Sequence, residues 1–270
     1  MIQKMFLTDI YNFFKADGDV YETKTLVRHP EVTVFISIAY IVLAKCLIPW
    51  ILEKRKPMEI KRTIVVYNLL VCLLNGILAY MAIVLTAEVW NNRCTVKNGA
   101  NKQQIQRGLH ITWYVWMVKH LELLDTVFFA LRKKNNQITF LHLFHHCAMV
   151  LVFGLGLYLR TIAFLCLFGT TLNVSIHVVM YLYYGLASIG PRMQKYLWWK
   201  KYLTILQIAH FIVILSYAVY GFVTGCENFG RTEIACFISV TTILVLFINF
   251  YKKSYHVKNP HFNKKYTDYM

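Results

Sequence analysis

Long apolar stretches separated by short polar segments make up most of the chain. A helix needs about 20 consecutive apolar residues to cross a bilayer. Tyr and Trp gather near the ends of these stretches, as is typical of side chains at membrane interfaces. We therefore expect an all-α polytopic membrane protein, a single domain over residues 1–270, with seven transmembrane helices at about 31–52, 64–88, 109–131, 138–159, 161–187, 201–224 and 232–251.

Composition supports a membrane protein and argues against nucleic-acid binding. Hydrophobic residues make up 57% of the 270 residues, and the mean hydropathy is +0.46, which soluble domains rarely reach. The formal net charge of +16 would suit a nucleic-acid partner, but nearly all Lys and Arg residues lie between the apolar stretches. We therefore expect membrane lipid, and no nucleic acid, among the partners.

The distribution of the basic residues predicts the orientation in the membrane. Of the 29 Lys and Arg residues, 17 lie in the loops after the first, third and fifth stretches and in the C-terminal tail, whereas 10 lie on the other side. Because cytoplasmic loops carry the excess of positive charge, we expect a cytosolic C-terminus and a lumenal or extracellular N-terminus. Cys94 and Cys226 then share the oxidising side, where they either form a disulfide or remain two separate thiols.

Four of the stretches carry polar side chains, which are costly in a bilayer and mark candidate functional positions. In the third stretch Lys119 and Glu122 lie one turn apart with Asp125 on the flank, so the first two either neutralise each other or take part in chemistry. A lone membrane histidine usually makes a contact between helices. Polar groups on four helices argue for more, and the other three helices supply His142, His145, His146, Asn173, His177, Tyr181, Tyr184, Gln207 and His210.

The depths of these residues predict that they meet. At 1.5 Å per residue along a helix, His145 lies about 10 Å from the cytosolic start of its stretch, and His177 about 15 Å from the cytosolic end of its own. Glu122 and Gln207 fall at similar depths. We therefore expect one polar chamber in the cytosolic half of the bilayer, open towards the cytosol.

Two kinds of chemistry fit histidines at i, i+3 and i+4 of a helix. An HxxHH box can bind metal, as in membrane di-iron oxidases and desaturases, but such a centre needs several boxes and this chain has one. A neutral imidazole can instead attack a thioester without a separate base, and the acyl-imidazole stays activated for a second nucleophile. We expect no metal and no bound cofactor. A seven-helix receptor or a transporter is a further alternative, although the cytosolic position of the cluster and the lack of a sequence repeat argue against both.

Four motifs, in order along the chain, resemble those of the very-long-chain fatty acid elongase family. They are KHLELLDT at 119–126, HLFHH at 142–146, NVSIHVVMYLYY at 173–184 and TILQ at 204–207. The resemblance implies a 3-ketoacyl-CoA synthase of the endoplasmic reticulum membrane, which condenses a long-chain acyl-CoA with malonyl-CoA and releases CO2 and CoA. It also implies that six of the helices form a barrel around an acyl tunnel, with one further helix packed outside.

The family motifs also imply roles for individual residues. His145 corresponds to the acyl acceptor and His177 to its partner, with His142, His146 and Asn173 in support. His210 stands where the family usually has a second Gln, which leaves its role open. Residues expected to bind substrate are Lys119, Glu122, Asp125, Tyr181, Tyr184, Gln207, Lys200 and Lys201. A homodimer and association with other enzymes of the elongation cycle are further expectations.

An acyl chain held by His145 should extend towards the lumen, because the chamber lies in the cytosolic half of the bilayer. About 15 to 20 Å of the roughly 30 Å hydrocarbon core then remain, which is enough for about 12 to 16 extended carbons. Residues two to four turns beyond the histidine box should meet the chain end, unless they only pack between helices or against lipid. They are Phe153, Leu157 and Tyr158, with Phe168 as the matching residue on the next stretch.

Overall fold

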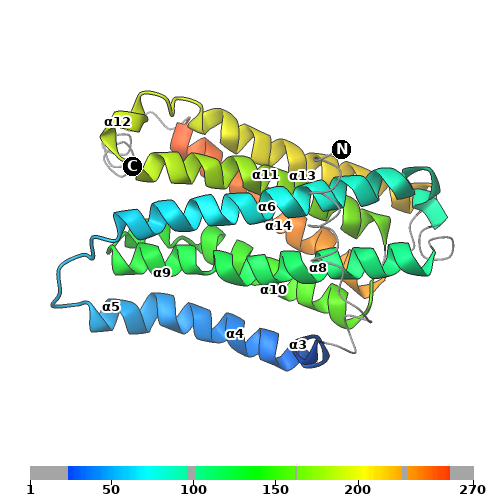
Figure 1. Cartoon of the computed structure of the whole chain (residues 1–270), viewed down its shortest axis with the longest axis horizontal. Helices are drawn as coiled ribbons and strands as arrows, with labels where there is room; N and C mark the ends of the chain where they lie inside the picture. The colour runs from blue at the N-terminus through cyan, green and yellow to red at the C-terminus, as the bar shows by residue number, and fades with distance from the viewer. Residues whose placement is uncertain (1–23, 96–100, 162, 227–229, 256–270) are drawn as a thin grey trace, which may run out of the picture.

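The computed structural model describes residues 24–95, 101–161, 163–226 and 230–255, and every regular element within them is helical. The long helices lie side by side along the long axis of the molecule (Figure 1). In chain order the elements are α3 (Thr25–Arg28), α4 (Pro30–Val42), the π-helix η1 (Leu43–Leu47), α5 (Ile48–Ile51), α6 (Lys61–Val89), η2 (Trp90–Thr95), α8 (Lys102–Glu122), α9 (Leu124–Leu131), η3 (Asn135–Gln137), α10 (Phe140–Tyr158), α11 (Phe164–Ser188), α12 (Pro191–Gln194), α13 (Lys200–Val223) and α14 (Arg231–Tyr255).

The predicted all-α architecture is confirmed for this described part of the chain, which contains helices long and apolar enough to cross a membrane. There are six of them: Pro30–Ile51, Lys61–Cys94, Phe140–Tyr158, Phe164–Ser188, Lys200–Val223 and Arg231–Tyr255. The third predicted stretch, 109–131, corresponds to most of α8 and all of α9, which meet at Leu123. It is not among the six, because α8 is more polar along its length than the other long helices and α9 has only 8 residues.

Local sequence signals set the starts of two helices that carry the polar residues. At the start of α10 the side chain of Thr139 accepts a hydrogen bond from His142 N at 3.2 Å, so the cap places the first histidine of the box one turn into the helix. At the start of α8, Asn101 and Gln104 form a capping box, with hydrogen bonds of 2.8 and 3.2 Å. Both helices therefore begin at defined residues.

Contacts between the long helices follow a closed order. α6 packs on α11, α11 on α13, α13 on α14, α14 on α10, α10 on α8, and α8 again on α6. α4 packs on α10 and α5 on α9, and Figure 1 shows α4 and α5 along one edge of the molecule. The four helices with the polar residues, α8, α10, α11 and α13, all belong to the closed set, so side chains on their inner faces can meet.

Large apolar side chains fill the interior and also cover the outside. Val71 and Val115 belong to a core between α6, α8 and α11, and Met149 and Ile214 to a second core between α10, α11, α13 and α14. On the outside Phe35 is 70% exposed. Many other large apolar side chains are exposed as well, which is unfavourable in water but suits contact with lipid.

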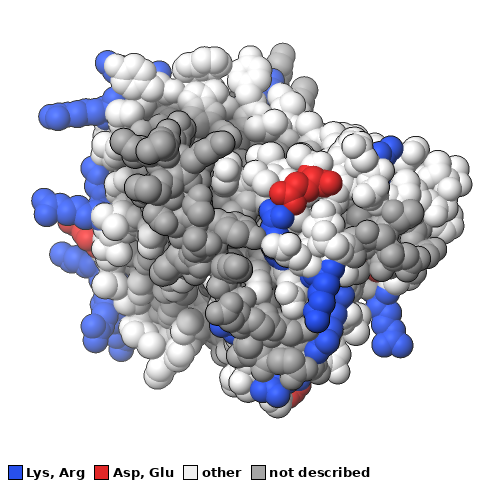
Figure 2. Space-filling view, turned by 45° about the vertical axis from the view of Figure 1, so that its right-hand side comes forward, with Lys and Arg blue, Asp and Glu red and all other residues white. Residues whose placement is uncertain are grey.

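Charged side chains gather at the ends of the helices. Figure 1 places α5, α9 and α12 at the same end; the segments after α5 and α9 carry Lys54, Arg55, Lys56, Arg132 and Lys133, and α12 itself carries Arg192. Figure 2 shows many Lys and Arg side chains projecting from the left-hand edge of the molecule, and further Lys, Arg, Asp and Glu side chains in its right half. The basic loops that the orientation argument grouped together therefore lie at one end of the helices.

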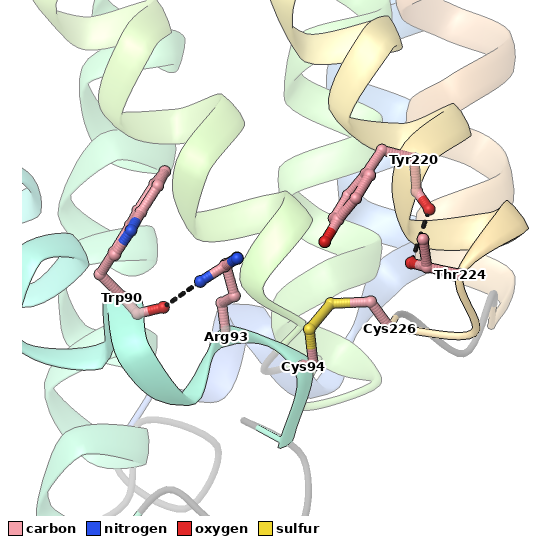
Figure 3. The surroundings of a disulfide bond; sticks show 6 residues. All are labelled: Trp90, Arg93, Cys94, Tyr220, Thr224 and Cys226. Atoms are coloured by element: carbon pink, nitrogen blue, oxygen red, sulfur yellow. Dashed lines mark hydrogen bonds between the residues drawn. A yellow bond between two sulfur atoms is a disulfide. The ribbon is translucent and has the colours of Figure 1, made fainter.

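A disulfide joins Cys94 and Cys226, with their Cα atoms 4.3 Å apart. Figure 3 shows that Cys94 follows α6 through η2, and that Cys226 follows the end of α13. Both neighbouring turns are held by local hydrogen bonds, from Arg93 Nη1 to Trp90 O at 3.1 Å and from Thr224 Oγ1 to Tyr220 O at 2.8 Å. The sequence left open whether Cys94 and Cys226 form a disulfide or remain two separate thiols, and in the structure they form the disulfide.

We expect this bond in the purified protein. Digestion without reductant should leave the peptides around Cys94 and Cys226 joined, and reductant should separate them, as peptide mass spectrometry can show. Cys46 serves as an internal control, because it is a free and exposed thiol that should be alkylated without reduction. Alkylation of Cys94 and Cys226 in non-reduced protein would contradict the bond and weaken the orientation argument as well.

Candidate active site

Glu122, on the last turn of α8, is the centre of a buried polar cluster. Lys119 Nζ donates hydrogen bonds to both carboxylate oxygens of Glu122, at 3.1 and 3.0 Å. On α11, His177 Nδ1 lies 2.9 Å from Glu122 Oε1 and 3.1 Å from Lys119 Nζ. These three side chains and Asn75 of α6, whose Nδ2 is 3.4 Å from Glu122 Oε1, are each at most 4% exposed. The ion pair is therefore closed off from bulk water. Its Coulomb attraction is stronger in the protein interior than it would be in water.

The carboxylate of Glu122 orients the imidazole of His177. A carboxylate only accepts hydrogen bonds, so it favours the tautomer in which His177 Nδ1 carries the proton; the ammonium of Lys119 beside this nitrogen then donates to Glu122 and not to the ring. The opposite nitrogen, Nε2, is then an acceptor that remains for another contact. Lys119 balances the negative charge of Glu122. The carboxylate can therefore orient the His177 ring while the proton stays on His177 Nδ1.

The HLFHH box lies on the first two turns of α10 and brings its three imidazoles together. The ring centroids of His142 and His146 are 4.4 Å apart, and those of His145 and His146 are 5.4 Å apart. The box also reaches across to α11, since the ring of His145 stacks with the ring of His177 at 6.2 Å and 23°. The structure thus brings the four histidines and Glu122 into one cluster, as the depth argument expected.

A hydrogen-bonded chain from α4 holds the first histidine of the box. His142 Nε2 and Thr126 Oγ1 are 2.7 Å apart, and the hydroxyl of Thr126 is also hydrogen-bonded to the hydroxyl of Tyr40. Sequence reasoning missed Tyr40 and Asn75. Asn75 could have been found, because an Asn is unusual within an apolar stretch. Tyr40 could not, because a tyrosine in the first stretch looks like any interfacial aromatic residue.

A second polar pair lies on the other side of Glu122. Tyr181 on α11 is fully buried, and its hydroxyl donates to Asp125 Oδ2 at 2.7 Å. The ring of Tyr184 lies 6.1 Å from that of Tyr181, but Tyr184 is 40% exposed and stands at the margin of the cluster. Asp125 and Tyr181 therefore extend the polar cluster one turn beyond Glu122 and His177.

The residues expected from α13 are more dispersed. Gln207 Nε2 contacts Met180 Sδ on α11 at 3.4 Å, one turn beyond His177. Lys200 and Lys201 lie on the first turn of α13, and Lys201 Nζ stands 5.9 Å from the ring of Tyr251. The two lysines therefore belong to the basic end of the molecule and are not part of the buried cluster.

An apolar cavity of about 70 Å³ lies between α8, α10, α11, α13 and α14. Asn173 and His210 line it near the histidine cluster, and Thr161 and Thr232, hydrogen-bonded to each other at 2.7 Å, line its other end. Its remaining walls are largely apolar, with Met149, Val152, Phe153, Phe211, Ile214 and Val240 among them. The cavity thus runs from the level of the polar cluster towards the end that carries the disulfide.

The four residues expected to set chain length occupy different places. Phe153 lines the cavity. Leu157 is buried beside Trp116, and Phe168 packs between Phe164 and Tyr217, with ring centroids 5.9 and 5.3 Å away. Tyr158 is 38% exposed. Of the four, only Phe153 lines this cavity.

Metal ligation was the alternative use of the histidines. Within residues 24–95, 101–161, 163–226 and 230–255, no group of three or more His, Cys, Asp or Glu side chains is arranged to hold a metal ion. His142 and His177 instead bond to a threonine and to a carboxylate. The arrangement suits proton transfer and nucleophilic attack by an imidazole oriented by its neighbours.

Imidazoles of this kind, held inside a helix bundle and next to an apolar cavity, can react with the head of a lipid-like ligand whose tail is buried. We therefore assign the protein to the multi-pass membrane enzymes. A family model described as ELO, the GNS1/SUR4 family, matches residues 25–263. The chain belongs to this family.

Relatives agree with this assignment over nearly the whole chain. Very long chain fatty acid elongase 7 of Rattus norvegicus is 34% identical over 250 residues, which cover 90% of this chain and 88% of the rat protein. Very long chain fatty acid elongase 4 of Homo sapiens is 32% identical over 255 residues, covering 92% and 80%. Elongase 7 of Drosophila melanogaster is 34% identical over 233 residues, covering 85% and 70%. The protein is an elongase-family enzyme of fatty acid elongation, and the predicted resemblance is confirmed.

Proposed function

We propose that the protein condenses a long-chain acyl-CoA with malonyl-CoA to give 3-ketoacyl-CoA, CO2 and CoA. The observation that carries the proposal is the stacked pair of His145 and His177, the latter bonded to Glu122, beside an apolar cavity. The names of the relatives, which are very long chain fatty acid elongases, support the same reaction class. Membrane lipid surrounds the protein, and no nucleic acid takes part.

The first half-reaction transfers the acyl group to His145. The free nitrogen of its imidazole attacks the thioester carbon, the C–S bond breaks, and CoA leaves with the proton that the imidazolium loses. His177 is the partner that relays this proton through Nε2, because its Nδ1 faces Glu122. His142 and His146 keep the box in place, the former through Thr126.

The second half-reaction forms the carbon–carbon bond. Loss of CO2 from malonyl-CoA leaves the electron pair of the broken C–C bond on C2, which attacks the acyl carbon while the C–N bond to His145 breaks and the departing ring nitrogen takes up a proton from solvent. The leaving carboxylate supplies the electron pair, so this step calls for no bound cofactor. Lys200 and Lys201 at the basic end of α13 are suited to the CoA phosphates, as cations near the membrane surface attract anionic groups.

The proposed reaction fits a particular arrangement in the membrane. α8 and α9 form a seventh crossing, whose charged residues are tolerated because they face the interior, and the six helices in closed contact enclose the acyl tunnel as one domain. The basic loops face the cytosol and the disulfide faces the lumen of the endoplasmic reticulum. A homodimer and contacts with other enzymes of the elongation cycle belong to the same proposal.

The direct test is incubation of the detergent-purified protein with acyl-CoA and malonyl-CoA labelled at C2. A labelled 3-ketoacyl-CoA, formed with equimolar CO2, is the expected product. The competing di-iron oxidase would instead consume O2, depend on iron and leave malonyl-CoA untouched. Oxidised acyl product without malonyl consumption would therefore replace the proposal with that alternative.

The cavity leads to a prediction for product length. Replacement of Phe153 by alanine removes a ring from the cavity wall, so we expect products roughly two or more carbons longer, at an unchanged rate for short substrates. Leu151→Ala is the matched control, because Leu151 is on the same helix and is 37% exposed. Product chains are measured by gas chromatography of the methyl esters. Identical product lengths in Phe153→Ala and in the unmodified protein would place the chain end elsewhere.

A further inference from the structure

Two buried polar side chains at the cavity lack the hydrogen bonds that such groups normally make. His210 of α13 is 6% exposed, and its ring approaches the backbone of Gln207 and Leu206 on its own helix without the geometry of a hydrogen bond, so neither ring nitrogen is satisfied by the described residues. Asn173 of α11 is 7% exposed, and its Oδ1 is likewise without a partner there. Both side chains line the cavity. Buried polar groups of native proteins are nearly always paired, so an unpaired set in one place calls for a ligand.

The register between α11 and α13 places His210 near the reacting histidines. The two helices run antiparallel, with Gln207 in contact with Met180 at one point. Further along, a Cβ atom at Gly169 would lie 3.8 Å from Ile214. His210 comes between these points, so it stands at the level of the turn from Asn173 to His177, which spans about 6 Å of helix.

The nature of the ligand follows from what each end of the cavity offers. The walls are largely apolar and suit a hydrocarbon chain, which cannot accept a hydrogen bond from an imidazole. The unpaired nitrogens lie at the end next to the histidine cluster, where the carbonyl group of a bound acyl chain would stand. A carbonyl oxygen accepts a hydrogen bond from a neutral imidazole N–H, and it does so more strongly when it becomes negative.

We propose that His210 is a catalytic residue, whose ring N–H donates a hydrogen bond to the acyl carbonyl oxygen and stabilises it as an oxyanion. The inference rests on the condensation proposed above. When His145 attacks, the carbonyl electron pair moves onto this oxygen, and its return expels CoA from the acyl carbon. When the malonyl-derived carbanion attacks, the same oxygen takes up charge again, and its return expels His145. His210 therefore serves both half-reactions, and Asn173 offers an amide at the same level.

A packing role for His210 makes opposite predictions. A histidine that only fills space can be exchanged for a side chain of similar volume at little cost to the rate, but a histidine that bonds to other protein groups cannot be exchanged without loss of stability. The oxyanion role predicts a different combination, in which the rate falls but the stability does not. Removal of the N–H lowers the rate, whereas stability is kept or gained, because an unpaired buried polar group disappears.

The test compares His210→Met with His210→Gln in detergent-purified full-length protein. We expect His210→Met to lower kcat about 10²- to 10³-fold, with little change in KM for either substrate and an equal or higher Tm. His210→Gln keeps an N–H donor and should restore most of the rate. Ile212→Met, on the outer face of α13 and 48% exposed, is the matched control and should behave as the unmodified protein.

A spectroscopic readout reports on the hydrogen bond itself. The acyl-enzyme formed from acyl-CoA labelled with ¹³C at C1, without malonyl-CoA, should show a carbonyl stretching frequency that rises in His210→Met and returns in His210→Gln. An unchanged frequency or rate, or a loss of folding in His210→Met, would each overturn the inference. If the unmodified protein itself forms no acyl-enzyme and no ketoacyl product, the proposed reaction is wrong instead.

Discussion

Replacement of His145 by alanine is expected to abolish both half-reactions. Without the imidazole, acyl-CoA incubated alone should release no CoA, and no acyl mass should appear on the peptide that contains residues 142–146. Loss of a covalent nucleophile typically lowers a rate by about 10⁶-fold, so elongation should fall below detection. The measurement combines a thiol assay of free CoA with mass spectrometry of the digested protein.

A second histidine provides the control for this experiment. His29 lies at the start of α4 and is bonded to Glu31 in an exposed pair, so His29→Ala should release CoA and elongate at the normal rate. The assignment of His145 as the acyl acceptor would be wrong if His145→Ala elongated normally. An acyl mass found on the peptide with His177 in the unmodified protein would move the covalent step to that ring.

Replacement of Lys119 by methionine should have the largest effect on stability. Glu122 would keep its buried position but lose its cation, and removal of one partner from a buried ion pair costs about 3–5 kcal/mol of unfolding free energy. The double change Lys119→Met with Glu122→Gln should recover much of that loss, because no uncompensated charge then remains. Thermal unfolding in detergent, followed by intrinsic fluorescence, gives the comparison.

The matched control is Lys253→Met at the end of α14, where the side chain is exposed. It should change the unfolding free energy by no more than about 0.5 kcal/mol. Equal stability of Lys119→Met and Lys253→Met would contradict a buried charge on Glu122. The double variant should stay inactive even when its stability is recovered, since His177 has then lost the carboxylate that orients it.

The helices were predictable from the sequence because lipid imposes a simple length and polarity on each crossing. Lys119 and Glu122 were predictable as neighbours for a similar reason, since three residues make nearly one helical turn. The meeting of His145 and His177 needed one further step, the counting of depth from the basic ends of two antiparallel stretches. These inferences use the geometry within one helix or the depth along the membrane normal, and none needs the rotation of one helix relative to another.

What could not be predicted depends on the rotation of each helix about its axis. α10 is apolar on nearly all sides, so its pattern could not tell that Phe153 lines the cavity whereas Tyr158 is partly exposed. The hydroxyl of Tyr40 reaches Thr126 from a helix outside the closed set, which no motif marks. The unpaired ring of His210 likewise becomes visible only when the surrounding side chains are in place.

The bond between Cys94 and Cys226 restricts the end of the helix bundle at which ligands can enter and leave. It ties the end of α6 to the end of α13, the two helices that flank α11, so these ends cannot separate while the bond is intact. At the opposite end no disulfide joins the described parts of α6 and α13, and Leu203 of α13 packs there against Tyr183 of α11. For the proposed reaction, we therefore expect substrates and products to pass through the end of the chamber opposite the disulfide. The tail of the acyl chain enters first and leaves last, and CoA from the first substrate must depart before malonyl-CoA can take its place.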